Sequence, residues 1–320
     1  MLRNIRLRPG PSPLYKGQIP LNAKGEPTHP IFAAHRLFTR TWMGELDYNR
    51  HKSNSTYFTD LDISRTALVT NLYFTGMGLM NREIEKKLRT TAGCESNSIL
   101  RNGNLMPIFV ALGSVYCTFK REIKPFQRYE VRSQIAGWDD KWMYIISYFF
   151  QGKKKAGQQK DDQSRSDPHG YRTPITAIAI SKYVVKKGRI TVSPERILRA
   201  GGFLPPRPEH VPPEPPIKLH PMGRSNGVDS DHASNVSTPP IGNGTASGGV
   251  DGSLVREVLK LNADQIPTQE ELEEQQNKNA FSSKSTDWSW DRIDLERRRG
   301  LGLVQAFGQL DAQLLGDWDA

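Results

Sequence analysis

The order of its patterned segments limits what this sequence can fold into more than any other feature. A strand-like stretch at 36–44 precedes a helical repeat over 57–72, and four strand-like stretches then follow in succession. The helical repeat has one side chain every three or four residues: Tyr57, Leu61, Ser64, Leu68 and Leu72. The later strands are expected at 105–121, 126–138, 141–151 and 172–187. This order predicts an α+β fold in which a bent antiparallel sheet wraps around one long helix.

Composition divides the chain around that pattern. The folded domain is expected over 35–202, after a Pro/Gly-rich N-terminal arm at 1–34. Within the domain, the polar stretch 152–171 is expected to be a mobile loop. Residues 203–285 are poor in large apolar groups and are expected to form a disordered linker. The last part, 286–320, regains a helical repeat and is expected to be an amphipathic helix that docks on the domain or on a partner.

Two smaller helices and one cap complete this outline. The stretch 80–90 is expected to form a second, exposed helix, and 254–261 a short one. Ser53 or Asn54 is a suitable N-cap for the long helix, because a side-chain oxygen there accepts a hydrogen bond from an unpaired amide.

Charge is divided in the same way. Residues 1–204 hold 33 of the 44 Lys and Arg but 16 of the 34 Asp and Glu, a net charge of +17, and the remainder is net −7. A basic domain suits phosphorylated cofactors, acidic carrier proteins, nucleic acid or a membrane surface, whereas solvated lysines are the plain alternative. Two cysteines imply no disulfide framework. With neither a signal peptide nor an apolar run of membrane-spanning length, we expect a soluble, cytoplasmic protein.

The segment 44–58, GELDYNRHKSNSTYF, concentrates the side chains that could carry chemistry. Glu45 and Asp47 follow the first strand, His51 comes four residues later, and Asn54 opens the helix. Amides at a helix N-terminus can polarise a carbonyl oxygen, while a nearby carboxylate attacks that carbonyl or activates water. The alternative is that these carboxylates only cap the helix and compensate its dipole.

Other kinds of site lack support in the sequence. It contains no GxxxxGK[ST] loop, no GxSxG elbow and no HExxH, so we expect neither nucleotide-triphosphate chemistry nor an α/β-hydrolase, and no metal or cofactor. Basic and aromatic residues alternate at 119–132, but this also fits a half-exposed strand, and no nucleic-acid partner is expected.

The segment GELDYNRHKSNSTYFTDLDISR resembles the helix-start pattern of hotdog-fold thioesterases, which reads approximately D-x-D, H-x-N-N, Y and D-x-x-R. Two more stretches, IAGWDDKWMYI (135–145) and SPERIL (193–198), are similar to the THEM-type branch and its fungal relatives. The matching residues in the helix-start pattern are Glu45, Asp47, His51, Ser53, Asn54, Tyr57, Asp62 and Arg65.

The resemblance implies an acyl-thioesterase acting on acyl-CoA or on a carrier-bound acyl or polyketide chain, accessory to fungal secondary-metabolite biosynthesis. It implies a homodimer or tetramer with the thioester between the helix start of one subunit and the sheet of its neighbour. Asp47 would be the nucleophile or general base, with Glu45 and His51 in the catalytic group. Asn54, Ser55 and Tyr57 would bind the substrate. Because Glu45 and Ser53 depart from the family pattern, a non-catalytic module that binds an acyl ligand or a protein is the alternative.

Overall fold

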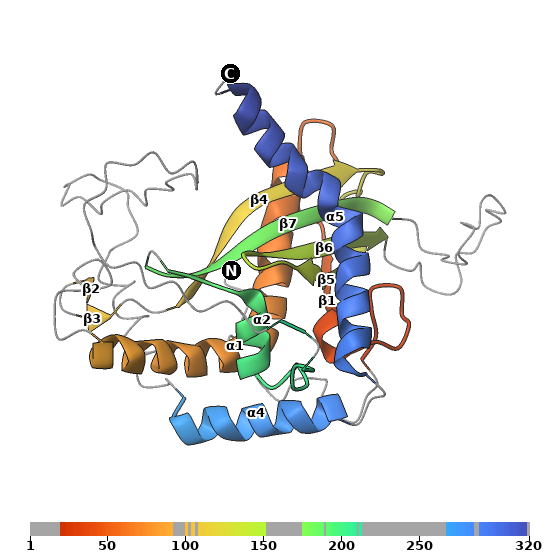
Figure 1. Ribbon diagram of the computed structural model, residues 1–320. Coiled ribbons are helices and arrows are strands. Elements are labelled where there is room, and N and C mark those ends of the chain that lie inside the picture. The colour runs from red at the N-terminus through yellow and green to blue at the C-terminus, as the bar shows by residue number, and fades with distance from the viewer. Residues whose placement is uncertain are drawn as a thin grey trace.

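The computed structural model describes residues 20–91, 100–101, 104–105, 108–151, 175–188, 190–209, 211–212, 267–284 and 288–318. Its strands are β1 (His35–Arg40), β2 (Leu100–Arg101), β3 (Asn104–Leu105), β4 (Phe109–Phe119), β5 (Arg128–Trp138), β6 (Trp142–Gln151), β7 (Ile175–Lys187) and β8 (Ile190–Val192). Its helices are η2 (Pro30–Phe32), η3 (Met43–Glu45), α1 (Asn54–Thr91), α2 (Pro194–Ala200), α4 (Gln269–Lys284) and α5 (Trp290–Trp318). Figure 1 shows how these elements are arranged.

One antiparallel sheet has the strand order β1-β5-β6-β7-β4, and β8 pairs with the end of β7. The turn between β5 and β6 is closed by Asp139, whose Oδ1 accepts hydrogen bonds from the amides of Lys141 (2.8 Å) and Trp142 (2.6 Å). The strands β2 and β3 form a separate small hairpin. The sheet and the helix α1 confirm the expected α+β plan, because the strand-rich stretches pair as predicted around that helix.

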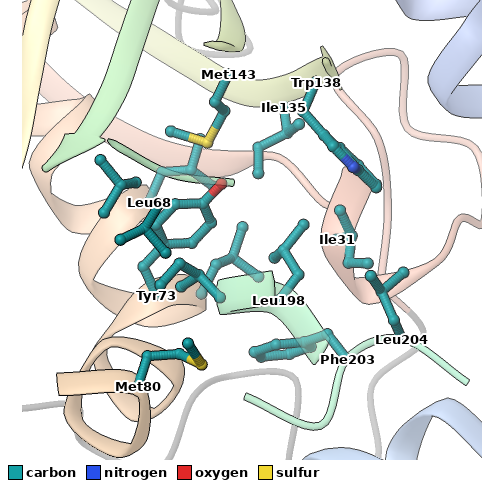
Figure 2. Packing of buried hydrophobic residues seen from close by; sticks show 14 of the residues in the cluster. Ile31, Leu68, Tyr73, Met80, Ile135, Trp138, Met143, Leu198, Phe203 and Leu204 are labelled. Atoms are coloured by element: carbon teal, nitrogen blue, oxygen red, sulfur yellow. The ribbon is translucent and has the colours of Figure 1, made fainter. Parts of the chain in front are cut away.

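The inner face of the sheet packs on α1 and forms the main core. Because side chains alternate along a strand, Val131 and Ile135 of β5 face the helix together with Met143 and Ile145 of β6. Figure 2 shows this packing at the middle of α1, where Tyr73 is fully buried. Burial of side chains of this size contributes about 1.5–3 kcal/mol each, so the inner face holds much of the fold's stability.

The helix α1 is longer than the sequence predicted. The prediction of a second, exposed helix at 80–90 is wrong, because these residues continue α1. The helix changes direction about halfway along its length (Figure 1). Met80 and Ile84 are buried in the main core. The helix packs closely on α2 at Gly76, where a Cβ would come within 1.9 Å of the carbonyl oxygen of Ile197.

Segments outside the predicted domain also pack on it. The residues 1–34 were expected to form an arm without a place in the core, yet Ile31 is completely buried and Phe32 stacks on Trp138. In the expected linker, Phe203 is buried in the same core. These two corrections have one cause, because isolated apolar side chains in Pro-rich stretches give no periodic signal.

The expected linker also contains α4, so the prediction of disorder through 203–285 does not hold there. The helix docks through Leu272, which fills the space beside Gly78 of α1, and through Asn279, whose Nδ2 donates to the carbonyl oxygen of Gly201 (2.6 Å). Its Glu- and Gln-rich sequence favours a helix despite few apolar groups. The predicted loop 152–171 and the predicted helix at 254–261 lie outside the described residues.

The outer face of the sheet is partly covered by α5 (Figure 1). Val304 of α5 packs with Ala136, Tyr144 and Ile146, which alternate with the inward residues. The approach is close, since a Cβ on Gly300 would lie 1.6 Å from the carbonyl oxygen of Ala136. The amphipathic segment therefore docks on its own domain. No helix in the described part of the chain is long and apolar enough to span a membrane.

Candidate functional site

The loop 41–53 joins β1 to α1 and carries the predicted catalytic residues. Its two sides are held together by backbone hydrogen bonds from the Asp47 amide to the His51 carbonyl (2.9 Å) and from the Ser53 amide to the Glu45 carbonyl (2.7 Å). Arg50 has φ = 62°, a left-handed conformation that non-glycine residues rarely adopt. Such strain persists only where surrounding contacts fix the backbone.

Asp47 is anchored by one carboxylate oxygen. Its Oδ1 accepts hydrogen bonds from the amides of Asn49 (2.9 Å) and His51 (3.2 Å). Among the residues that the structure describes, the second oxygen, Oδ2, accepts none. Asp47 is half-buried, so its carboxylate is held in a defined position with one oxygen still open to another molecule.

Glu45 is placed differently, because its carboxylate is paired. The Nζ of Lys52 lies 3.1 Å from Glu45 Oε2, and the amide of Trp42 donates to the same oxygen (3.4 Å). Glu45 therefore fixes the loop and the position of Lys52.

Lys52 and Asp60 form a buried ion pair that the sequence analysis missed. The Lys52 side chain is fully buried, and its Nζ lies 3.0 Å from Oδ2 of Asp60, whose side chain is 4% exposed. The hydroxyl of Tyr129 donates to the same Asp60 oxygen. A signal was present, because Asp60 comes three residues after Tyr57 and four before Ser64 on the inward stripe of α1.

His51 pairs with a carboxylate outside the loop. Its Nε2 lies 3.0 Å from Oε2 of Glu122, which follows β4, and the neighbouring amide of Lys52 donates to the carbonyl oxygen of Ile123 (2.9 Å). The loop is thereby joined to the connection between β4 and β5. Asp47 contacts the backbone of His51, whereas the imidazole is oriented by Glu122.

The start of α1 presents small polar groups. Asn54 and Ser55 are exposed in the first turn, and the hydroxyls of Ser53 and Ser55 are 2.9 Å apart. The first amides of a helix lack partners within the helix and carry partial positive charge. The 41–53 loop thus brings the Asp47 carboxylate to the same end of α1 as these amides.

Tyr57 belongs to the core. Its ring is 2% exposed and lies 5.0 Å from the rings of Phe119 and Phe149. Burial is the main cause that raises the pKa of its hydroxyl. Its side chain therefore supports the helix start from inside.

The last part of the helix-start pattern is also structural. Arg65 is 1% exposed and donates to Ser181 Oγ (2.6 Å) and to the carbonyl oxygen of Leu61 (3.0 Å). It also forms an ion pair with Asp62. This arginine ties α1 to β7. No group of three His, Cys, Asp or Glu side chains in the described ranges is arranged to hold a metal ion.

The sequence of this chain is similar to those of known proteins. The sequence pattern of the thioesterase-like superfamily matches residues 41–175, from the start of the 41–53 loop to the start of β7. The thioesterase lcsJ of Purpureocillium lilacinum is 32% identical over 286 residues, which are 89% of this chain and 70% of that protein. The probable thioesterase atnL of Emericella nidulans is 40% identical over 177 residues, 52% of this chain and 53% of that protein.

Among solved structures, the probable thioesterase YbaW of Escherichia coli aligns with 52% of this chain and 93% of its own, at 14% identity and a TM-score of 0.31. The chain spans about half the length of atnL but most of lcsJ. The similarity to lcsJ extends well beyond the sheet and α1. By this similarity and by its helix-start pattern, the chain belongs to the thioesterase-like superfamily.

Proposed function

We propose that this protein hydrolyses acyl thioesters, with the acyl group carried on coenzyme A or on the phosphopantetheine of a carrier protein. The observation that carries the proposal is the Asp47 carboxylate, which the 41–53 loop holds by one oxygen beside the start of α1. Two relatives from fungi bear the name thioesterase. Together with the resemblance to accessory enzymes, they support a role in a fungal secondary-metabolite pathway.

The proposed chemistry uses the open oxygen of Asp47. As a general base, this oxygen takes a proton from water while the water oxygen bonds to the thioester carbon. As a nucleophile, it bonds to that carbon itself, and water then hydrolyses the acyl-enzyme. In both routes the first-turn amides of α1 stabilise the negative charge that develops on the carbonyl oxygen, and the C–S bond breaks to release the thiol.

The other predicted residues have supporting roles in this proposal. Asn54 and Ser55, exposed at the helix start, contact the thioester or the attacking water. The backbone of His51 contacts the Asp47 carboxylate, and its imidazole, which Glu122 orients, lies at the proposed substrate site. Glu45 acts as a positioning residue, because its ion pair with Lys52 holds the loop that carries Asp47. Tyr57 acts through its backbone position and its packing.

The proposal extends to a homodimer assembled through β4. This strand is at the edge of the sheet, and four of its large apolar side chains are 39–48% exposed: Phe109, Leu112, Tyr116 and Phe119. A long apolar edge is a template for pairing with another strand. Because Glu122 lies three residues after the end of β4 and contacts His51, a second copy paired there would lie beside the 41–53 loop. Light scattering of the wild type and of a variant with Leu112→Lys and Tyr116→Lys tests this, since only the variant should be a monomer.

The test of the proposed activity is hydrolysis of a panel of acyl-CoA and acyl-pantetheine thioesters by wild type and Asp47→Asn. Loss of the base or nucleophile should lower the rate by at least about 10²-fold. Asp140→Asn is the matched control, because Asp140 is an exposed aspartate in the β5–β6 turn and should keep the wild-type rate. Equal rates for wild type and Asp47→Asn would remove Asp47 from its role. Retention of a thioester without turnover, seen by native mass spectrometry, would favour a binding module instead.

A further inference from the structure

The outer face of the sheet carries an arginine cluster where β1 pairs with β5. Arg36, Phe38 and Arg40 alternate with the inward residues of β1, and all three are exposed. Their partners in register on β5 are Arg132, Glu130 and Arg128, in that order. Four arginines and one glutamate therefore share this part of the face.

Glu130 contacts only two of these arginines, Arg36 and Arg132. Its Oε1 accepts from the Nε of Arg132 (2.9 Å) and from the Nε of Arg36, and its Oε2 accepts from Nη2 of Arg132 (3.0 Å). Burial of this carboxyl opposes ionisation, yet the hydrogen bonds from both arginines outweigh it and lower the pKa of Glu130. Arg36 and Arg132 are thus held by Glu130, whereas Arg40 and Arg128 have no contact with this carboxylate.

Arg40 and Arg128 lie directly opposite each other across the two strands, and both are exposed. Within the described ranges, no carboxylate forms an ion pair with either of them. Like charges at directly opposed positions destabilise a sheet. A bound anion would remove that repulsion, and it would have to be compact to reach both guanidinium groups at once.

An aromatic ring lies beside Arg40, one of these two arginines. The guanidinium of Arg40 lies 4.5 Å from the centre of the Trp42 ring, and Trp42 is 46% exposed. Trp42 is also part of the 41–53 loop, because its carbonyl oxygen accepts a hydrogen bond from the amide of Glu45 (3.0 Å). An arginine pair and an exposed indole are therefore continuous with the loop that holds Asp47.

We propose that Arg40 and Arg128 bind the phosphates of the nucleotide end of a coenzyme A thioester, and that Trp42 stacks on its adenine. Arginine recognises phosphate oxygens through paired N–H groups, and exposed aromatic rings stack on bases. This inference rests on the proposed thioester hydrolysis. It also separates the two substrate classes, because carrier-bound phosphopantetheine has one phosphate in a diester and no adenine, and so would leave Trp42 unused.

The first experiment measures binding of adenosine 3′,5′-bisphosphate, which carries the adenine and the 3′-phosphate of coenzyme A but no thioester. Calorimetry is run on the full chain at low and at physiological salt. Binding should weaken with added salt, and the double variant Arg40→Ala/Arg128→Ala should bind at least about tenfold more weakly. Trp42→Ala should lose about fivefold or more. Arg298→Ala, which removes an exposed arginine from α5, is the matched control and should bind within about twofold of wild type.

The second experiment compares an acyl-CoA with the same acyl group on N-acetylcysteamine, a thiol that lacks the nucleotide. The double variant should lower the ratio of the two kcat/KM values by about tenfold or more, since only the CoA substrate uses the arginines. An unchanged ratio, or no nucleotide binding by the wild type at low salt, would overturn the inference. Nucleotide binding with no thioester turned over would instead defeat the proposed hydrolysis and leave the nucleotide site standing.

Discussion

The helix α5 contacts the sheet backbone at Gly300, so substituting this glycine tests whether the C-terminal segment docks as described. In Gly300→Ala, the new Cβ would lie 1.6 Å from the carbonyl oxygen of Ala136. That oxygen belongs to the backbone of β5 and is not the end of a flexible side chain. The helix must therefore move outward from β5.

The size of the effect follows from what the movement exposes. Ile293 and Val304, on either side of Gly300, are 2% and 1% exposed, and full burial of each contributes about 1.5–3 kcal/mol. Replacing glycine by alanine within a helix raises the free energy of unfolding by about 1 kcal/mol, which offsets part of this loss. If both contacts are lost, the free energy of unfolding should fall by about 2–5 kcal/mol.

Urea unfolding followed by circular dichroism measures this difference, and Gly302→Ala is the matched control. A Cβ on Gly302 would meet no atom within 4 Å, so this variant should gain up to about 1 kcal/mol from helix propensity. The two glycines are two residues apart in one helix and are predicted to respond with opposite signs. If Gly300→Ala were as stable as Gly302→Ala, the close contact between α5 and β5 would not exist in solution.

Two further predictions concern buried ionisable groups. Lys52→Met leaves the Asp60 carboxylate buried without its cation and should lower the free energy of unfolding by about 3–5 kcal/mol in urea unfolding. Lys87→Met, which removes an exposed ion pair on α1, is the control and should change the same free energy by less than about 0.5 kcal/mol. Burial lowers the pKa of His29 from 6.5 to about 3, so between these values the unfolded chain binds a proton that the folded chain does not. Stability should therefore fall by about 1.4 kcal/mol per pH unit as the pH decreases from 6.5 towards 3. His29→Asn, whose Oδ1 replaces Nδ1 as the acceptor for the Ile31 amide, should flatten that part of the profile, and an unchanged slope would show that His29 is not buried in its neutral form.

The sequence predicted those parts of the fold that depend on local periodicity and turn chemistry. Alternating side chains located β5, β6 and β7, and the short gap left between the expected strands 126–138 and 141–151 is the turn that Asp139 closes. The helix-start pattern also predicted where α1 begins, at Asn54. These features are encoded within a few residues of where they act.

The parts that were missed depend on contacts between distant segments. Nothing near Gly76 shows that α1 continues to Thr91, because Gly76 packs on α2, which is distant in the sequence. The pairing of Lys52 with Asp60 was missed because a lysine before a helix usually points to water, whereas here Tyr129 and Glu45 close around it. The predicted roles of the site residues were assigned by sequence position alone, which could not distinguish the paired carboxylate of Glu45 from the partly open one of Asp47.

The C-terminal extension and the arginine cluster are connected through β5. The helix α5 covers the end of this strand that contains Ala136, and Nη1 of Arg297 donates to the carbonyl oxygen of Trp138 (2.8 Å). Arg128 lies at the opposite end of the same strand and remains exposed. Burial from water stabilises apolar side chains but not charged arginines, so α5 packs on the apolar end of β5. Among the described residues, the end of the outer face that α5 leaves uncovered is the one that continues into the 41–53 loop.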